Sequence, residues 1–172
     1  MNKNIVLVGL SGSGKTTLGN ILSDLSGYSL IDTDAIIVKL QNRSINNIFA
    51  TNGEEYFRQL EMLVSKEVSQ YASQIISTGG GIVLKEENLK NLKQNGLVFY
   101  LKTSINSLIK RLEGDTTRPL LKTDDVKKKL ENMLEAREKL YEKADFTIET
   151  DNLSPEETAK EILRIYHERS NS

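Results

Sequence analysis

The stretch Gly9–Thr16, GLSGSGKT, follows the apolar run Ile5–Val8 near the start of the chain. It matches the pattern G-x-x-x-x-G-K-[ST], in which glycine backbone lets successive N–H groups surround a phosphate. The β-branched run before it suits a buried strand, and helical residues follow it, so the motif lies between a strand and a helix. A glycine-rich turn could match by chance, but this context favours a nucleoside triphosphate site.

Each residue type in this motif has its own chemical use. The backbone of Gly12, Ser13 and Gly14 can surround phosphate oxygens, and the positive end of the following helix adds attraction. The Lys15 ammonium can reach the β and γ phosphates, and the Thr16 hydroxyl can bind Mg²⁺. No guanine-reading N/T-K-x-D segment is present, which argues against a GTPase.

Length and composition are those of an ordinary globular protein. The chain has 172 residues, 38% of them hydrophobic and 27% charged, which suits a single domain over residues 1–172. A net charge of −1 provides no overall field to attract nucleic acid or an anionic membrane. Cysteine is absent and no apolar run has membrane-spanning length, so we expect a cytoplasmic protein that binds neither nucleic acid nor membranes. These features also favour a monomer.

Apolar segments that suit strands alternate with segments of helical period. The strand candidates are Ile5–Val8, Ser29–Ile31, Gln74–Thr78, Leu97–Leu101 and Phe146–Thr150. The helix candidates are Lys15–Leu25, Glu54–Ala72, Lys85–Gln94, Ile105–Leu112, Val126–Tyr141 and a last helix from Ser154 onward. The alternation predicts an α/β fold of three layers, a five-stranded parallel sheet with helices on both faces. The polar segment 113–125 is expected to be a mobile lid.

Two acids follow the second predicted strand. Asp32 and Asp34 are expected at alternate strand positions, with both carboxylates on one side at the edge where open α/β sheets bind ligands. One carboxylate can serve Mg²⁺ through water, and the other can accept a hydrogen bond from a substrate hydroxyl. The alternative is a helix N-cap followed by an exposed acid.

Arg58 has acidic neighbours at helical spacing, Glu54 at i−4 and Glu61 at i+3. In isolation this spacing favours a solvated ion pair on a helix surface. The three glycines Gly79–Gly81 follow the third predicted strand and offer bare backbone to which a small ligand can come close. Three consecutive glycines are costly for a mere turn, so a functional loop is favoured.

Taken together, these motifs resemble those of the shikimate kinase family of P-loop proteins. The matching segments are GLSGSGKTT, IDTDAII, GEEYFRQLE, STGGGIV, TTRPLL and AREKLYEKAD, which occur in the family's order over nearly the whole chain. That family transfers the γ-phosphate of ATP to the 3-hydroxyl of shikimate, a step toward chorismate and the aromatic amino acids. The resemblance implies ATP and shikimate as small-molecule partners and Mg²⁺ as the cofactor.

The resemblance also implies roles for individual residues on the acceptor side. Asp34 would contact the shikimate hydroxyls and act as the base, while Arg58 and Arg137 would hold the carboxylate. Gly80 would contribute a backbone contact to the same ligand. Arginine forks and a paired carboxylate suit a molecule with one carboxylate and three hydroxyls.

On the nucleotide side, the resemblance implies that Lys15 and Arg118 are catalytic together with Asp34. Thr16 and Asp32 would hold Mg²⁺. The implied ATP-binding set comprises Gly12, Ser13, Gly14, Lys15, Thr16, Thr17, Arg111, Arg118 and Pro155. Arg111 and Pro155 would flank the adenine, although a proline at the first position of a helix also has a purely structural reason.

Two rival functions stay open at this point. A kinase of another small hydroxylated acid, such as gluconate, could use the same scaffold, but the paired arginines with TGGG favour shikimate. A non-catalytic ATP-binding module is the second rival. The intact set of Lys15, Thr16, Asp32, Asp34 and Arg118 argues against it.

Overall fold

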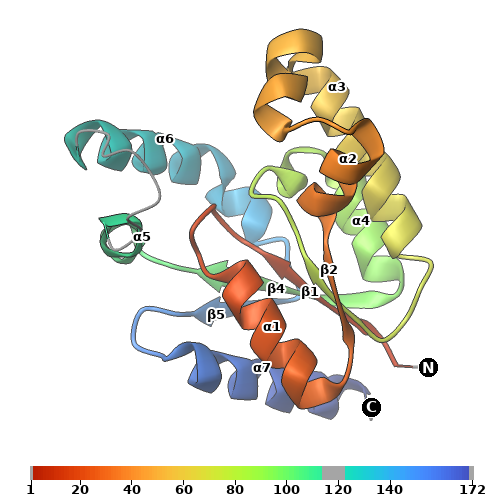
Figure 1. The fold of residues 1–172 in the computed structure, drawn as a ribbon. Helices are drawn as coiled ribbons and strands as arrows, with labels where there is room; N and C mark the ends of the chain where they lie inside the picture. Colours follow the sequence, from red (N-terminus) through yellow and green to blue (C-terminus); the bar gives the residue numbers. More distant parts are fainter. Residues whose placement is uncertain (1, 114–122, 171–172) are drawn as a thin grey trace.

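The computed structural model describes residues 2–113 and 123–170, so Arg118 and most of the expected lid at 113–125 lie outside the described residues. Five strands within these ranges form one parallel sheet (Figure 1). They are β1 (Asn4–Val8), β2 (Ser29–Asp32), β3 (Gln74–Ser77), β4 (Gly96–Lys102) and β5 (Phe146–Glu149). The spatial order β2-β3-β1-β4-β5 puts β1 at the centre and β5 at an edge. The predicted five-stranded parallel sheet is confirmed.

Helices cover both faces of the sheet, which confirms the predicted layers. One face carries α2 (Thr33–Gln41), α3 (Ile45–Val68), α4 (Glu86–Gln94), α5 (Ile105–Glu113) and α6 (Thr123–Tyr141). The other face carries α1 (Lys15–Ser26) and α7 (Pro155–Ser170) (Figure 1). None of the helices in the described ranges is long and apolar enough to cross a membrane.

The alternation of side chains along β1 separates two hydrophobic cores. Val6 and Val8 are fully buried on the face of α2 to α6, whereas Ile5 and Leu7 are fully buried against α1 and α7. This is the pattern expected of a central parallel strand covered on both sides. The same strand therefore anchors both layers and fixes the place where its carboxyl end opens into a loop.

Parallel pairing brings the carboxyl ends of β1, β2 and β3 to one edge of the sheet. The chain leaves β1 to reach β2 on one side of the sheet and later returns to β4 on the other. Such a switch point leaves a crevice outside the carboxyl ends of the strands, where ligands bind in open α/β sheets. The glycine-rich motif, Asp32 and Gly79–Gly81 all follow these strand ends.

The end of β2 differs from the prediction. Asp32 ends the strand and also caps α2, because its carboxylate accepts a hydrogen bond from Ala35 N at 3.0 Å. Asp34 therefore lies in the first turn of α2, and the two acids do not occupy alternate strand positions. The cap at Asp32 and the burial of Ile37 stabilise a helix at this point of the chain.

The other difference lies in α3, which begins at Ile45 rather than at Glu54. Helical geometry breaks inside it at Gly53, where φ is 81° and ψ is 173°. Only glycine adopts this conformation at low cost, so the chain changes direction there and a second helical stretch begins. The predicted helix corresponds to this second stretch, which carries Arg58 and Glu61.

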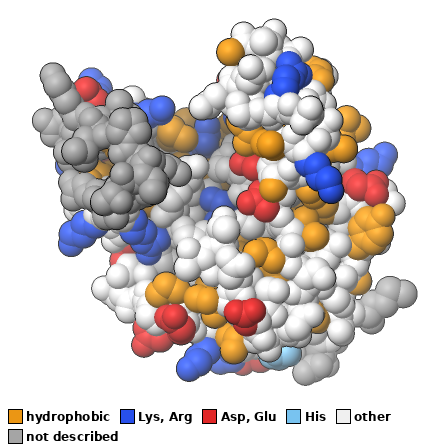
Figure 2. Space-filling view, in the orientation of Figure 1, with side chains coloured by type: hydrophobic (Ala, Val, Ile, Leu, Met, Phe, Trp, Pro, Cys, Tyr) orange, Lys and Arg blue, Asp and Glu red, His pale blue; other side chains and the backbone are white. Residues whose placement is uncertain are grey.

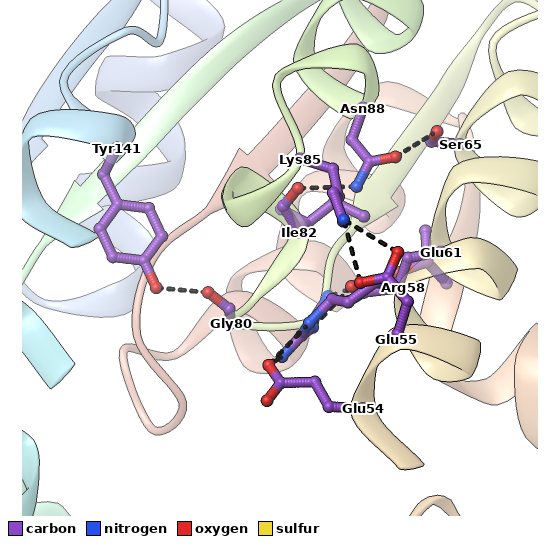
Figure 3. Close-up of polar contacts among 12 residues, drawn as sticks. Glu54, Glu55, Arg58, Glu61, Ser65, Gly80, Ile82, Lys85, Asn88 and Tyr141 are labelled. Carbon is purple, nitrogen blue, oxygen red and sulfur yellow. Dashed lines mark hydrogen bonds and ion pairs between the residues drawn. The ribbon is translucent and has the colours of Figure 1, made fainter. Parts of the chain in front are cut away.

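A buried polar network fixes the segment after β3. Asn88 of α4 donates to the Ile82 carbonyl at 2.8 Å and accepts from the Ser65 hydroxyl of α3 at 3.0 Å (Figure 3). Asn91 adds a bond to the same hydroxyl at 3.3 Å. Buried polar groups that are fully paired hold one geometry. The network ties the 3₁₀ turn Ile82–Leu84 to α3 and α4, and thereby fixes the C-terminal side of the three glycines.

Candidate active site

The phosphate loop, defined here as Gly9–Lys15, connects β1 to α1. Gly12 and Gly14 have φ values of 84° and 92°, in the left-handed region that residues with a side chain seldom adopt. The Ser13 N–H donates to the Leu10 carbonyl at 3.1 Å and closes the turn. Helix α1 begins directly after Gly14, so its unpaired N–H groups open onto the loop. This arrangement can bind a phosphate by backbone donors alone.

Lys15 lies folded against its own loop. Its ammonium donates to the carbonyls of Gly9 at 2.6 Å and Leu10 at 2.9 Å, and the residue is only 8% exposed. Burial lowers the pKa of Lys15 to about 8, and the nearby carboxylates of Asp34 and Asp32 oppose the fall. The group is therefore still positively charged at pH 7. It supplies a local cation in a protein whose net charge is close to zero.

A cavity of about 480 Å³ lies at the carboxyl edge of the sheet. Figure 2 shows the molecule hollowed on this face, beneath the lobe formed by α2 and α3, with acidic side chains on the wall. Its lining comes from the phosphate loop, α1, the junction of β2 and α2, the end of β3 with the residues after it, and α5. The lining residues are Ser11, Gly12, Gly14, Lys15, Thr16, Thr17, Asp32, Asp34, Ser77, Thr78, Gly79, Gly80 and Arg111. The fold thus brings the phosphate loop and both predicted acids into one cavity.

Asp34 is half-buried, and one of its carboxylate oxygens, Oδ1, is buried without a hydrogen-bond partner. Burial raises its pKa, the neighbouring Asp32 raises it further, and Lys15 and Arg58 oppose the rise. A Cβ atom on Gly79 would come within 2.6 Å of Oδ1, so the glycine backbone makes room for this side chain. Such an unpaired acceptor suits a ligand that brings a hydroxyl group.

Arg58 forms a buried ion pair with Glu61, in contrast to the solvated pair that the spacing alone favoured. Its Nη1 lies 2.6 Å from Glu61, and Nη2 lies 3.1 Å from the more exposed Glu54 (Figure 3). Arg58 is 7% exposed and Glu61 fully buried, and the guanidinium lies 5.9 and 5.4 Å from the ring centres of Phe49 and Phe57. The ion pair and the two rings hold the guanidinium in one position.

Glu61 itself keeps a free acceptor in this buried setting. Burial raises the pKa of its carboxyl, and the hydrogen bond and charge of Arg58 oppose that rise. Its second oxygen, Oε1, has no hydrogen-bond partner. The residue belongs to the segment quoted above, but the helical spacing gave no sign of its burial.

The glycine loop, defined here as Gly79–Gly81, is packed between these groups and the phosphate loop. A Cβ on Gly81 would overlap the Arg58 guanidinium. A Cβ on Gly80 would lie 3.2 Å from Ser11 N and 3.8 Å from the Arg137 guanidinium. The predicted residues Asp34, Arg58, Gly80 and Arg137 are therefore all placed around this loop.

A second cavity of about 260 Å³ lies beside the phosphate loop, between it and the start of α7. Ser13, Gly14, Thr17, Arg111 and Pro155 are among its lining residues. Gly14, Thr17 and Arg111 line both cavities, so the two adjoin along the loop. Pro155 also fulfils the structural alternative, because it follows Ser154, whose hydroxyl accepts from Glu157 N at 3.1 Å in a capping box.

Comparison with known proteins assigns the chain to a family. Residues 11–167 match the family model described as shikimate kinase. A shikimate kinase of Thermodesulfovibrio yellowstonii is 41% identical over 169 residues, which cover 98% of either chain. The chain belongs to the shikimate kinase family. Membership assigns it to the ATP-dependent kinases that phosphorylate shikimate.

Solved structures of the shikimate kinase family have the same fold as this chain. A shikimate kinase from Acinetobacter baumannii, solved in complex with shikimate, is 35% identical to this chain, and the two structures have a TM-score of 0.89. The match covers 100% of this chain and 97% of the Acinetobacter chain. A gluconokinase from Sinorhizobium meliloti is 17% identical with a TM-score of 0.62, over 98% of this chain and 94% of its own. At that identity the second likeness concerns the fold alone, so it gives no support to gluconate as the acceptor.

The sequence analysis did not single out Tyr141, which lies beside the glycine loop of this chain. Its hydroxyl donates to the Gly80 carbonyl at 2.5 Å from the last turn of α6 (Figure 3). The residue stands in the quoted segment AREKLYEKAD, at i+4 from Arg137, which is the spacing of neighbours on one helix face. That spacing was the one signal that could have drawn attention to it.

Replacement of Asp34 by asparagine is expected to stabilise the fold at pH 7. Because the folded protein raises the pKa of Asp34, the ionised carboxylate destabilises the native state above that pKa. The penalty fades as the pH falls toward the unfolded value of about 3.9. We expect Asp34→Asn to raise Tm at pH 7 by roughly 2–4 °C, the shift that accompanies about 1 kcal/mol in a domain of this size.

Thermal unfolding at pH 7 and pH 4 tests this expectation. The Tm difference between Asp34→Asn and the wild type should be smaller at pH 4. The exposed Asp24 provides the control, and Asp24→Asn should change Tm by less than about 1 °C. A lower Tm for Asp34→Asn at pH 7 would contradict the buried, unpaired setting of the Asp34 oxygen Oδ1.

Proposed function

We propose that this chain transfers the γ-phosphoryl group of ATP to the 3-hydroxyl of shikimate in the cavity at the carboxyl edge of the sheet, with Mg²⁺ as cofactor. The observation that carries the proposal is the shared cavity itself. Lys15 and the phosphate loop line one part of it, and Asp34 and Gly80 line another. A phosphate donor and a hydroxylated acceptor can therefore meet there without a large change of the fold.

The acceptor side suits a small carboxylate that carries hydroxyl groups. Arg58 is held by Glu61 before any ligand binds, so its guanidinium offers a fork of donors in a fixed position. Arg137 lies on the other side of the glycine loop and would share the carboxylate. The free Asp34 oxygen would accept from a ring hydroxyl, and the Gly80 backbone would add a contact.

The nucleotide side would occupy the phosphate loop and the adjoining second cavity. The backbone of Gly12, Ser13 and Gly14 and the side chains of Thr16 and Thr17 would surround the phosphates. Arg111 and Pro155 line the second cavity, where they would flank the adenine. Arg111 is already anchored near the loop by a 3.4 Å bond to the Gly12 carbonyl.

The residues present fit Mg²⁺ bound chiefly by nucleotide oxygens. No group of three or more His, Asp or Glu side chains in the described part of the chain could hold a metal ion by itself. Mg²⁺ on a nucleotide needs only one or two protein oxygens, and Thr16 and Asp32 supply hard oxygen ligands in the shared cavity. Bound there, Mg²⁺ would neutralise negative charge on the phosphates.

In the proposed reaction, the 3-hydroxyl oxygen forms a bond to the γ-phosphorus while the bond from that phosphorus to the β–γ bridging oxygen breaks. ADP leaves with the negative charge, and the hydroxyl proton passes to the Asp34 carboxylate. Burial raises the pKa of Asp34, which makes its carboxylate a stronger base for this proton. Lys15, and Arg118 outside the described residues, would neutralise charge on the transferring group.

An ATP turnover assay with shikimate, with gluconate and with no acceptor tests the function directly. We expect Mg²⁺-dependent ADP release with shikimate, almost none with gluconate or water, and loss of activity in EDTA. Equal turnover with gluconate would contradict shikimate as the acceptor, and full activity in EDTA would contradict the roles of Thr16 and Asp32.

Arg58 would hold a carboxylate that does not change during the reaction, so its loss should weaken binding rather than the chemical step. We expect Arg58→Ala to raise the shikimate KM by a factor on the order of 10² with a smaller change in kcat, since charged hydrogen bonds contribute about 1.5–3 kcal/mol. Arg58→Lys should be nearly as harmful because an ammonium cannot form the fork. Steady-state kinetics at saturating ATP measures both, and a pure kcat effect would contradict the assignment.

Arg118 is proposed to meet charge that develops on the transferring phosphoryl group. Its replacement by alanine should lower kcat by a factor on the order of 10³, typical of a cis-acting arginine in phosphoryl transfer, with little change in shikimate KM. The same assay compares it with Arg58→Ala. Should Arg118→Ala alter only shikimate KM, its assignment to the phosphates is wrong.

A further inference from the structure

Tyr141 is buried at the end of α6 and belongs to none of the sets of residues assigned above to ATP, shikimate or Mg²⁺. It is 0% exposed, and its ring stacks on Tyr100 with ring centres 5.0 Å apart and an angle of 17° between the planes. The packing of the ring would be equally good for phenylalanine. The hydroxyl therefore needs a separate explanation.

That hydroxyl connects two groups of the proposed acceptor side. It donates to the Gly80 carbonyl, 61 residues away in sequence, and approaches the glycine loop from the side opposite Arg58 and Glu54 (Figure 3). Burial raises the pKa of Tyr141, and the positive charge of Arg137, one turn earlier on α6, opposes the rise, which places the guanidinium near this hydroxyl. The single proton of the Tyr141 hydroxyl goes to the Gly80 carbonyl, so only the lone pairs of its oxygen are left to interact with the guanidinium.

The Tyr141 hydroxyl therefore lies between the charge of the Arg137 guanidinium and the Gly80 carbonyl, to which it is bonded. In a buried setting a neighbouring positive charge polarises the hydroxyl and strengthens the hydrogen bond that it donates. Arg137 also lies close to Gly80: its Nη1 is 3.8 Å from the place that a Cβ on Gly80 would occupy. This agrees with the arrangement. One hydroxyl thus fixes both the orientation of a guanidinium and the position of a loop backbone.

We propose that Tyr141 is a positioning residue for the acceptor, which acts through Arg137 and Gly80 without touching the ligand. This inference rests on the proposed function, because it concerns the same acceptor side. On one side of the glycine loop, the ion pair with Glu61 holds Arg58 in place. On the other side, Tyr141 holds Arg137 and the Gly80 backbone in place. Preorganisation of this kind lowers the cost of binding a small ligand.

Tyr141→Phe tests the proposal, because it removes the hydroxyl and keeps the stacked ring. Tyr166→Phe is a matched control: Tyr166 is 3% exposed, and its hydroxyl donates to the Lys3 carbonyl at 2.7 Å. Each variant therefore loses one buried tyrosine hydroxyl that bonds to a backbone carbonyl. Steady-state kinetics with shikimate and with ATP, and Tm by circular dichroism, would be measured for both and for the wild type.

We expect Tyr141→Phe to raise the shikimate KM about tenfold, the effect of leaving buried partners unsatisfied, and Tyr166→Phe to leave it within about twofold. ATP KM should stay within about twofold in both variants, and Tm should fall by similar amounts. Equal shikimate KM values in the two variants would overturn the proposal.

Failure of Tyr141→Phe to fold would also overturn it, since the hydroxyl would then hold the fold rather than the acceptor side. A wild-type protein inactive on shikimate would instead contradict the proposed function. The two failures are therefore distinguished by the wild-type rate alone.

Discussion

The acceptor side depends on one steric constraint, the absence of side chains from the glycine loop. Asp34 and the Arg58 guanidinium both lie where a Cβ on Gly79 or Gly81 would have to be. Arg58 in turn is held there by Glu61, which is fully buried. The bare loop therefore lets charged groups from α2 and α3 meet the end of β3, directly beside the phosphate loop.

This arrangement lowers the stability of the native state, and contacts elsewhere in the fold compensate for part of the loss. A buried carboxylate oxygen without a hydrogen-bond partner destabilises the native state, and Asp34 and Glu61 each have one such oxygen. The ion pair with Arg58 compensates part of this cost for Glu61. The network of Asn88, Ser65 and Asn91 holds the chain after the glycine loop in place. Unpaired buried groups of this kind are expected where binding groups are held in place before a ligand arrives.

The sequence was enough to predict the sheet and the phosphate loop, because both depend on local patterns. Apolar β-branched runs marked the strands, and the glycine spacing after Ile5–Val8 marked the loop. The end of β2 was predicted wrongly because Asp32 serves as strand end and helix cap at once, which alternation alone does not reveal. The start of α3 was missed because Gly53 interrupts its helical period.

Contacts between residues distant in sequence could not be predicted in the same way. The spacing of Arg58 and Glu61 predicted an ion pair, but their burial depends on the glycine loop and on Phe49 and Phe57. The bond of Tyr141 to Gly80 joins two segments that only the complete fold brings together. Local patterns therefore located the groups that carry the chemistry, while the tertiary structure determined which groups hold them in place.

Gly81→Ala is the most direct test of this account. Gly81 has φ −92° and ψ 4°, a conformation that residues with a side chain also adopt in turns. The three atoms nearest to an added Cβ all belong to the Arg58 guanidinium, so the methyl group would displace it. The account predicts a folded protein with unchanged ATP KM and a shikimate KM raised by about a hundredfold, as expected for a binding group displaced by about 1 Å. An unchanged shikimate KM in a folded Gly81→Ala variant would contradict it.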